Sequence, residues 1–387
     1  MDARLSDLVD NAHAQKIFDL LQHKGFEARF IGGCVRDALL QRPLTDIDIA
    51  TNATPDQVME TFSPHGIKII PTGIAHGTVT AVIEKQHFEI TTLRRDIETD
   101  GRHAQIAFSN DWKVDAERRD FTVNALSLDG SGHIYDYYNG MDDLNNRSLR
   151  FIGNAAQRIQ EDYLRILRYF RFLSVLGWDY IDAEALQSCT ELAAHLAKLS
   201  RERIQGELYK LLAGKNSVPV ASLLQQHKIL HGLKITNLDT EALAGLVTLE
   251  KRHAETDPLR RLIALTGSYV EAYLGKLIII TRNDRKRLEA LARIQEHQYW
   301  KLEKLLYFYG IQAVKDFYFL RKPSLDFSII QNWKKPQFPL KAAEIMHLGN
   351  GPGPLLGKIL KEAEIYWVDR NFKPDKEELI ACAASVL

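Results

Sequence analysis

The sequence is poor in the features that mark several specialised protein classes. It contains 3 cysteines in 387 residues (Cys34, Cys189 and Cys382), and none of them forms a CxxC pair. This spacing argues against a disulfide scaffold and against a zinc knuckle. No apolar run approaches the ~18 residues of a membrane span, and the N-terminal residues are typical of neither a secretory signal nor a transit peptide. We therefore expect a cytoplasmic protein with reduced thiols and no membrane association.

The sequence also lacks a net charge, because 50 lysines and arginines balance 50 aspartates and glutamates. Hydrophobic residues make up 45% of the chain, which is typical of a globular protein and excludes wholesale disorder. A neutral balance does not indicate a nucleic-acid-binding protein, but it does not exclude one, because local basic patches decide that question. At roughly 150 residues per domain, the length predicts two to three domains.

The pattern of the chain changes near residue 150. Before that point, short strand-like runs alternate with helical patterns, and Thr54 followed by Pro55 is typical of a helix start. The expected strands are 28–31, 46–51, 78–83, 88–93 and 134–138, and the first long helix is expected at 11–23. After residue 154 helical spacing dominates, over 161–176, 182–197, 201–213, 217–226 and 240–252, while 277–281 fits a strand or a buried helix. The predicted fold class is α+β, with an N-terminal mixed α/β head followed by an all-helical remainder.

Two aspartates stand on either side of Ile47 in an expected strand. Side chains at positions i and i+2 of a strand point to the same face, so Asp46 and Asp48 would lie together. Two such carboxylates repel each other unless a cation lies between them. Oxygen ligands favour Mg²⁺, although an exposed strand end can carry the same pattern with no metal. Glu89, on a neighbouring expected strand, is either a third acid of this site or a solvent-facing side chain.

A glycine pair precedes these aspartates at an expected strand-to-helix turn. Gly32 and Gly33 let a backbone approach a phosphate closely, and Arg36 adds a guanidinium that can bind it. A glycine pair by itself is more often a tight turn. Together with the two aspartates it indicates a nucleoside triphosphate held by the turn and two metal ions held by the carboxylates, which is an arrangement for nucleotidyl transfer.

Two downstream segments are rich in arginine. Arg119, Asp120 and Asn124 can bind a ribose and phosphates, or can form a surface ion pair with a capping asparagine. Between Arg150 and Arg171 the chain has five arginines and two acids, so it is locally basic. Asp162 and Arg165, expected on one helix, form either an ordinary i,i+3 ion pair or a base-reading pair. In the second case the carboxylate accepts from the exocyclic amine of cytosine or adenine, and the guanidinium donates to ring acceptors.

These motifs, in this order, resemble the class II CCA-adding enzymes, which are tRNA nucleotidyltransferases of the polymerase-β nucleotidyltransferase superfamily. The matching segments are GGCVRDALL at 32–40, TDIDIAT at 45–51, RRDFTVNAL at 118–126, DYYNGMDDLNNRSLR at 136–150, EDYLRILRYFRF at 161–172 and RERIQGELYKLL at 201–212. The resemblance implies a seahorse-like arrangement of four parts. These are a catalytic nucleotidyltransferase head at 1–150, a helical neck with a nucleotide-selecting helix at 151–215, a helical body at 216–290 and a helical, tRNA-binding tail at 291–387.

The resemblance also implies the roles of individual residues. They are Asp46 and Asp48 for catalysis through two Mg²⁺ ions, Gly33 and Arg36 for the triphosphate, Arg119 with Asp120 for the sugar and phosphates, Asp162 and Arg165 for the choice of CTP and then ATP, and Arg168 and Arg171 for support of the template helix and the nucleotide. The segment 94–115, with Asp100-Gly101-Arg102-His103, corresponds to a flexible loop needed for the switch to ATP.

The same resemblance implies the partners. The substrates are CTP and ATP, and the body and tail of a monomer would contact the acceptor and TΨC arms of tRNA through phosphates. The body has no His-Asp dyad that we can place near His253, so no phosphohydrolase activity is expected. The alternatives are a bacterial-type poly(A) polymerase, which shares the head and neck, or a partial enzyme that adds only CC or only A. A non-enzymatic RNA-binding protein is disfavoured by the intact pair Asp46 and Asp48.

Overall fold

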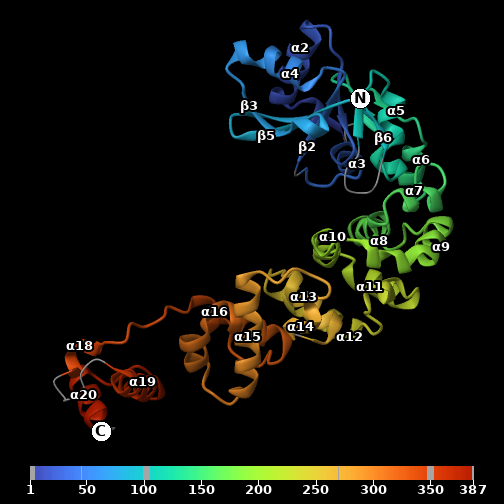
Figure 1. The fold of residues 1–387 in the computed structure, drawn as a ribbon. Coiled ribbons are helices and arrows are strands. Elements are labelled where there is room, and N and C mark those ends of the chain that lie inside the picture. The colour runs from blue at the N-terminus through green and yellow to red at the C-terminus, as the bar shows by residue number, and fades with distance from the viewer. Residues whose placement is uncertain (1–4, 45, 99–104, 269, 347–352, 386–387) are drawn as a thin grey trace. The chain divides into compact units, whose positions relative to one another are not determined.

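The computed structural model describes residues 5–44, 46–98, 105–268, 270–346 and 353–385. The chain divides into two compact units, Met1–Asn237 and Leu238–Leu387. The first unit combines a sheet with helices, and the described part of the second unit is helical (Figure 1). This confirms the predicted α+β class. Within the described residues, no helix is both long and apolar enough to cross a membrane.

The first unit is built on a seven-stranded sheet. Its strand order is β3-β4-β5-β2-β1-β8-β9, and β2 and β5 are its parallel pair. The strands are β1 Ala28–Ile31, β2 Ile47–Thr51, β3 Lys68–Gly73, β4 Thr78–Ile83, β5 Gln86–Thr92, β8 Ser127–Leu128 and β9 Ile134–Tyr135, and β6 Arg94–Glu98 with β7 Gln105–Phe108 forms a separate hairpin. The five strands expected from the sequence are all present within a few residues of their predicted bounds. The strands β3, β6, β7 and β8 were not predicted.

The sheet is covered on one face by α2 (Ala12–His23) and α4 (Pro55–Phe62), which lie together in Figure 1. Phe18 of α2 packs on Phe30 of β1 with ring centroids 4.7 Å apart. Both helix starts are capped by side chains. The predicted start of α4 is confirmed, since Thr54 forms a capping box with Gln57 and Pro55 occupies the first turn. Burial of these apolar faces holds the strands that carry the acidic residues in place.

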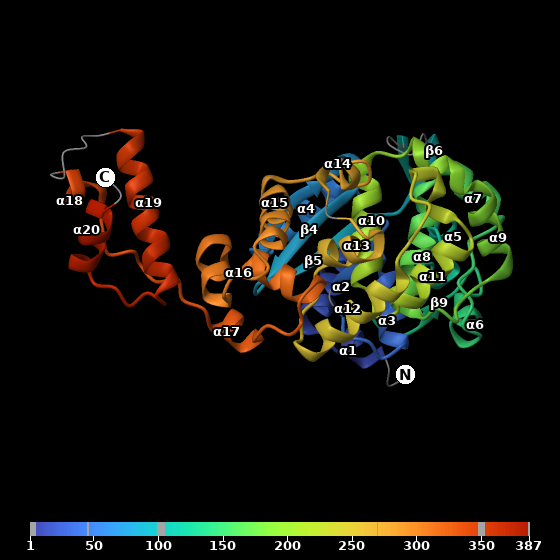
Figure 2. The ribbon, with the colours of Figure 1, turned by 90° about the horizontal axis from the view of Figure 1, so that it is seen from below.

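Helices follow the sheet from residue 155 to the end of the first unit, and they pack beside one another in Figure 2. The helices of the first unit besides α2 and α4 are α1 Ser6–Val9, α3 Gly33–Leu39, α5 Trp112–Glu117, α6 Gly140–Asn145, α7 Ala155–Glu161, α8 Leu164–Leu176, α9 Ala183–Leu192, α10 Arg201–Ala213 and α11 Ser217–Gln226, with 3-10 turns at Ser63–His65, Ile74–His76, Thr122–Asn124, Ala193–Lys198 and Ile229–Leu233. The expected helices at 201–213 and 217–226 are confirmed. The one expected at 182–197 ends early and continues as a 3-10 turn.

The expected single helix over 161–176 is wrong. Helix α7 ends at Glu161, and Asp162 has extended backbone angles (φ −155°, ψ 104°). The Asp162 carboxylate accepts a hydrogen bond from the backbone N–H of Leu164 at 3.1 Å, so it satisfies a free donor at the start of α8. Aspartate favours such local bonds over a helix interior, which explains the break. Asp162 and Arg165 therefore do not share one helix.

The second unit contains α12 Thr240–Arg252, α13 Pro258–Thr266, α14 Glu271–Leu274, α15 Arg282–Glu296, α16 Leu302–Leu320, α17 Phe327–Asn332, α18 Ala342–Ile345, α19 Pro354–Asp369 and α20 Lys376–Ser385. The helix expected at 240–252 is confirmed. The run 277–281 is neither strand nor helix, because it forms the turn before α15, where Thr281 is the N-cap. One apolar core joins α12, α15, α16 and α17, and another joins Tyr307 to α19 and α20.

Candidate active site

A cavity of about 660 Å³ in the first unit brings most of the predicted site residues together. Its lining is Gly32, Gly33, Arg36, Asp48, Arg94, Arg118, Arg119, Asp120, Asn124, Asp162, Leu164, Arg165, Arg168, Arg171, Phe172 and Arg203. These residues come from segments as far apart in the sequence as β1 and α10. Asp46 precedes β2 and lies outside the lining, although it is close enough to Asp48 to affect its charge. A cavity with this many cationic groups is suited to a polyanionic ligand.

The cavity carboxylate Asp48 lies on β2, which pairs with β5. Asp48 on β2 stands beside Glu89 on β5 in parallel register. The pKa of Asp48 is raised to about 6, mainly by burial and then by repulsion from Glu89, with a further contribution from Asp46, while Arg119 opposes the shift. This repulsion is what a bound cation would relieve, and carboxylate oxygens are the ligands that Mg²⁺ prefers.

The donor set fits a metal ion that is also bound by its substrate. Within the described ranges, no three His, Cys, Asp or Glu side chains are gathered closely enough to hold an ion by themselves. Mg²⁺ usually binds through one or two carboxylates and completes its shell with water and substrate phosphates. Asp46 and Asp48 therefore fit such a site, and the nearby charge of Glu89 adds to the repulsion at Asp48.

The turn between β1 and α3 approaches the cavity closely. Gly32 has φ 68°, and a Cβ atom there would come within 3.0 Å of Arg119 Nη1. The positive φ favours glycine at this position, and a side chain there would also displace the Arg119 guanidinium. Arg36, on the first turns of α3, is buried and donates to both carboxylate oxygens of Asp37 at 2.9 and 2.8 Å, and to Asn124 Oδ1 at 2.5 Å. Its guanidinium is therefore held in place before any ligand binds.

The two predicted base-reading residues have different partners in this structure. Asp162 Oδ2 accepts a hydrogen bond from Arg203 at 2.6 Å. Arg165 donates to Glu161 at 2.5 Å and to the backbone carbonyl of Arg158 at 2.6 Å. Asp162 and Arg165 therefore do not form the ion pair with each other that was one of the two interpretations of the sequence. Each of them pairs with another residue. Both side chains line the same cavity, so a single ligand can contact both.

Arg168 and Arg171 project from α8 and are held by buried acids. Arg168 donates through Nε to Asp120 at 2.8 Å, and Arg171 donates to Glu207 of α10 at 3.2 Å. Burial alone would raise the pKa of Asp120, but Arg168 and the Asn124 amide hold it below its usual range. Asp120 is 8% exposed and lines the cavity, and its expected contact with a sugar stays a prediction.

Phe172 and Arg203 are cavity residues that the sequence interpretation missed. Phe172 lies beneath the guanidinium groups of Arg171 and Arg36, whose carbon atoms are 4.4 and 5.2 Å from its ring centroid. Arg203 and Glu207 are four residues apart on α10, so they share a helix face, and this face meets α8. This four-residue spacing was the signal in the sequence that could have shown Arg203 and Glu207 to lie on one face of a helix. Asp100 to His103 of the expected flexible loop lie outside the described residues.

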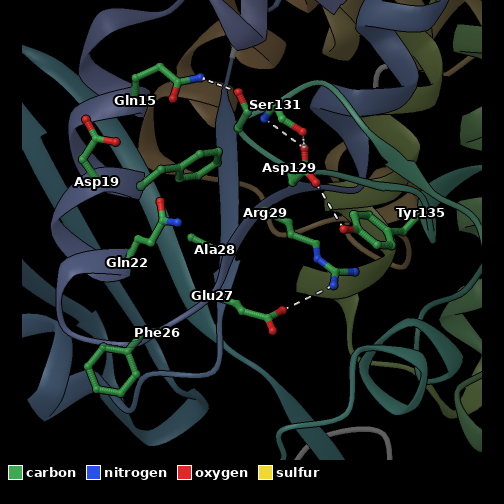
Figure 3. A pocket seen from close by; sticks show the side chains of 12 residues that line it. Gln15, Asp19, Gln22, Phe26, Glu27, Ala28, Arg29, Asp129, Ser131 and Tyr135 are labelled. Atoms are coloured by element: carbon green, nitrogen blue, oxygen red, sulfur yellow. Dashed lines mark hydrogen bonds and ion pairs between the residues drawn. The ribbon is translucent and has the colours of Figure 1, made fainter.

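A second cavity, of about 580 Å³, lies between α2, β1 and the β8–β9 turn (Figure 3). Several of its polar side chains have hydrogen-bond partners. Gln15 donates to the carbonyl of Gly130 at 3.0 Å, and Asp129 accepts from Tyr135 at 3.1 Å. Arg29 stacks on Tyr135, 3.5 Å from the ring centroid, and contacts Glu27 at 3.4 Å. None of the predicted site residues lines this cavity.

Comparison with known proteins gives consistent results. The family model described as "Poly A polymerase head domain" matches residues 28–150, and the one described as "Probable RNA and SrmB- binding site of polymerase A" matches residues 180–236. The Homo sapiens protein named CCA tRNA nucleotidyltransferase 1, mitochondrial, is 34% identical over 95% of this chain and 88% of its own length. The CCA-adding enzyme of Streptococcus gordonii is 34% identical over 95% of this chain and 96% of its own. The structure of the Bacillus stearothermophilus CCA-adding enzyme in complex with CTP matches with a TM-score of 0.77 at 26% identity, covering 100% of this chain and 98% of that one.

Proposed function

The chain belongs to the class II CCA-adding nucleotidyltransferase family, and from this membership we propose that it adds CCA to the 3′ end of tRNA without a nucleic-acid template, using CTP and ATP. The observation that carries the proposal is the cavity of about 660 Å³ in the first unit. It combines Asp48, a group of arginines able to bind a triphosphate, and the pair Asp162 and Arg165. A relative at 34% identity over 95% of the chain is itself named for the reaction.

We propose that the triphosphate lies between the β1–α3 turn and the arginines of the cavity. Gly33 allows close approach of the phosphates, while Arg36 and Arg119 neutralise their charge. Asp46 and Asp48 would hold two Mg²⁺ ions. When bound, such ions lower the pKa of an attacking hydroxyl and stabilise the charge of a leaving pyrophosphate. Arg119 would also contact the ribose.

The base is chosen by hydrogen-bond pattern. Asp162 would accept from the exocyclic amine of cytosine or adenine, and Arg165 would donate to the ring nitrogen or carbonyl beside it. Uracil and guanine present a carbonyl where the amine is needed, so they would leave the Asp162 carboxylate facing another acceptor. In this structure Arg203 and Glu161 hold the two side chains, so a base would have to share or displace these contacts. Arg168 and Arg171 would support the template helix and the nucleotide.

The helices of the body and tail would bind the acceptor and TΨC arms of tRNA as part of a monomer. Such contacts use phosphates and shape and carry little sequence information. In this proposal the head at 1–150 carries out catalysis and the neck at 151–215 selects the nucleotide. The body at 216–290 and the tail at 291–387 bind the tRNA. A poly(A) polymerase is the second candidate, because the matching head family is described by that name. A partial CC- or A-adding enzyme is the third.

One incubation experiment separates these activities. A tRNA that lacks its 3′ CCA is incubated with each nucleotide alone and with CTP plus ATP, and the product ends are sequenced. We expect CC from CTP alone, no extension from ATP alone, and CCA from the mixture. Long A tracts from ATP alone would favour the poly(A) polymerase, and a product that stops at CC in the mixture would favour the partial enzyme. Asp46→Ala serves as the inactive control.

A further inference from the structure

A buried carboxylate on α5 contacts two of the cavity arginines without lining the cavity itself. Asp115 is 3% exposed. Its Oδ1 atom accepts hydrogen bonds from Arg118 Nε at 2.9 Å and from the backbone N–H of Arg94 at 3.2 Å, and its Oδ2 atom accepts one from Arg119 Nη2 at 3.1 Å. One carboxylate therefore joins both arginines to the first residue of β6.

The charges explain why this carboxylate is needed. Arg118 and Arg119 are adjacent in the chain, both side chains are more than four-fifths buried, and both line the cavity. Two neighbouring guanidinium groups repel each other, and the repulsion is stronger where water is excluded. Burial alone would raise the pKa of Asp115, but Arg119 and Arg118 hold it below its usual range, so it is a carboxylate at neutral pH.

The other end of α5 is anchored independently. Trp112 donates from Nε1 to Glu27 at 2.9 Å, and the Arg29 guanidinium lies 4.0 Å from the centroid of its ring. Figure 3 shows Arg29 contacting Glu27 beside Tyr135, on which it also stacks. Because α5 is fixed to the sheet in this way, Asp115 is a fixed point from which the two arginines extend.

Arg119 also has little freedom on its far side. Its Nη1 atom lies 3.0 Å from the position that a Cβ atom of Gly32 would occupy, and 3.5 Å from the carbonyl oxygen of Asn124. The guanidinium is thus held between Asp115 and the turn proposed to receive the triphosphate. A change at Asp115 would alter the direction in which the remaining N–H groups point.

We propose that Asp115 is a positioning residue that orients Arg118 and Arg119 to bind the triphosphate of the incoming nucleotide. The inference rests on the proposed function, because it assumes that a nucleoside triphosphate enters this cavity. Asp115 is absent from the cavity lining, so it acts on the phosphates through the arginines and not on the base. It follows that CTP and ATP are affected by the same factor.

Asp115→Asn is the first test. Asparagine keeps one acceptor oxygen and replaces the other with an NH₂ group, so at least one arginine loses its partner. We expect KM for CTP and KM for ATP each to rise about tenfold, which is the effect of losing roughly one charge-assisted hydrogen bond. The value of kcat should change by less than about threefold. In calorimetry, CTP binding should weaken by the same factor, whereas cytidine, which has no phosphates, should bind unchanged.

Asp111→Ala is the matched control on the same helix. Asp111 is the N-cap of α5 and accepts from the N–H groups of Lys113 and Val114 at 2.8 and 3.4 Å. Its loss should lower the unfolding midpoint without changing KM for CTP. If Asp111→Ala raises KM as Asp115→Asn does, the effect belongs to the stability of α5 and the inference is overturned.

A double-mutant cycle tests whether Asp115 affects nucleotide binding by positioning Arg118. When Arg118→Gln and Asp115→Asn are combined, the rise in KM should be smaller than the product of the two single rises. Each single change already breaks the contact between Asp115 and Arg118, so the second change has less left to remove. Multiplicative effects, or an equal loss of cytidine and CTP binding, would overturn the inference. Asp115→Glu, which keeps the charge, should give a smaller rise than Asp115→Asn, and a larger one would count against it. If the wild type binds CTP but fails to extend tRNA, the proposed function fails while the binding comparison still decides the role of Asp115.

Discussion

At the scale of single residues, the charge of Asp48 opposes folding in the absence of a cation. Burial and the repulsion of Glu89 raise its pKa to about 6 from 3.8. The folded protein therefore binds a proton more tightly than the unfolded chain, so the free energy of unfolding decreases as pH rises from about 4 to 6 and stays lower above 6. The charge that we propose binds Mg²⁺ is thus held at a cost in stability.

Asp48→Asn tests this balance. In EDTA at pH 7.5, we expect the variant to be more stable than the wild type by about 1–2 kcal/mol, once the shift is discounted for solvent screening, and to have no nucleotide-addition activity. The gain should vanish at pH 4, where Asp48 of the wild type is protonated. Thermal unfolding at the two pH values measures it, with Asp19→Asn on the exposed face of α2 as the control for loss of one charge. Equal changes at both pH values would contradict the expectation.

A second prediction at this scale concerns the choice of base. Asp162→Ala removes the proposed acceptor for the exocyclic amine and leaves Arg203 without its 2.6 Å contact. We expect incorporation of UTP and GTP relative to CTP to rise by roughly tenfold or more, since the penalty against a facing carbonyl disappears. Asp179→Ala, which breaks the exposed pair with Arg147, is the matched control. An unchanged order of nucleotide preference would mean that the base is read elsewhere.

At the scale of elements, local signals placed helix ends well where a capping residue follows a clear non-helical segment. Thr54 and Pro55 indicated the start of α4, and the structure has it there. The apolar spacing of Leu164, Leu167 and Leu173 begins only after Asp162, so the prediction that the helix starts at residue 161 had no apolar residue of this stripe to support it. A polar cap inside an amphipathic pattern has no periodic signature, and only the backbone geometry reveals it.

The cap of α4 allows a prediction about stability alone. Thr54→Ala removes the side-chain acceptor for Gln57 N–H and weakens the capping box. We expect a loss of about 1 kcal/mol in the free energy of unfolding, with CTP affinity unchanged because α4 lies outside the cavity lining. Denaturant unfolding and calorimetry measure the two quantities, and Thr54→Ser should restore most of the stability. A weakened CTP affinity would show that α4 affects the site.

At the scale of the whole molecule, all residues lining the cavity belong to the first compact unit. A chain that ends at Asn237 retains the sheet, α7 to α11 and the complete lining. We expect this truncated protein to bind CTP within about threefold of the full chain, and to bind tRNA at least tenfold more weakly, because helical contacts to phosphates are lost. Fluorescence titrations with both ligands test this. Parallel losses of CTP and tRNA affinity would contradict a separate tRNA-binding role for the second unit.

The sequence by itself determined the order of motifs, the change from mixed α/β to helix near residue 150, and the identity of the charged residues, since these depend on local pattern and spacing. It also predicted from strand periodicity that Asp46 and Asp48 share a face, whereas Asp46 precedes β2 in the structure and lies outside the cavity lining. The pairs of Asp115 with Arg118 and Arg119 are local, at i,i+3 and i,i+4 spacing. Only the tertiary structure decided which charges from distant segments meet. That Asp120 pairs with Arg168 and Asp162 with Arg203 depends on packing between separate elements, and a chain with 50 charges of each sign allows many other pairings.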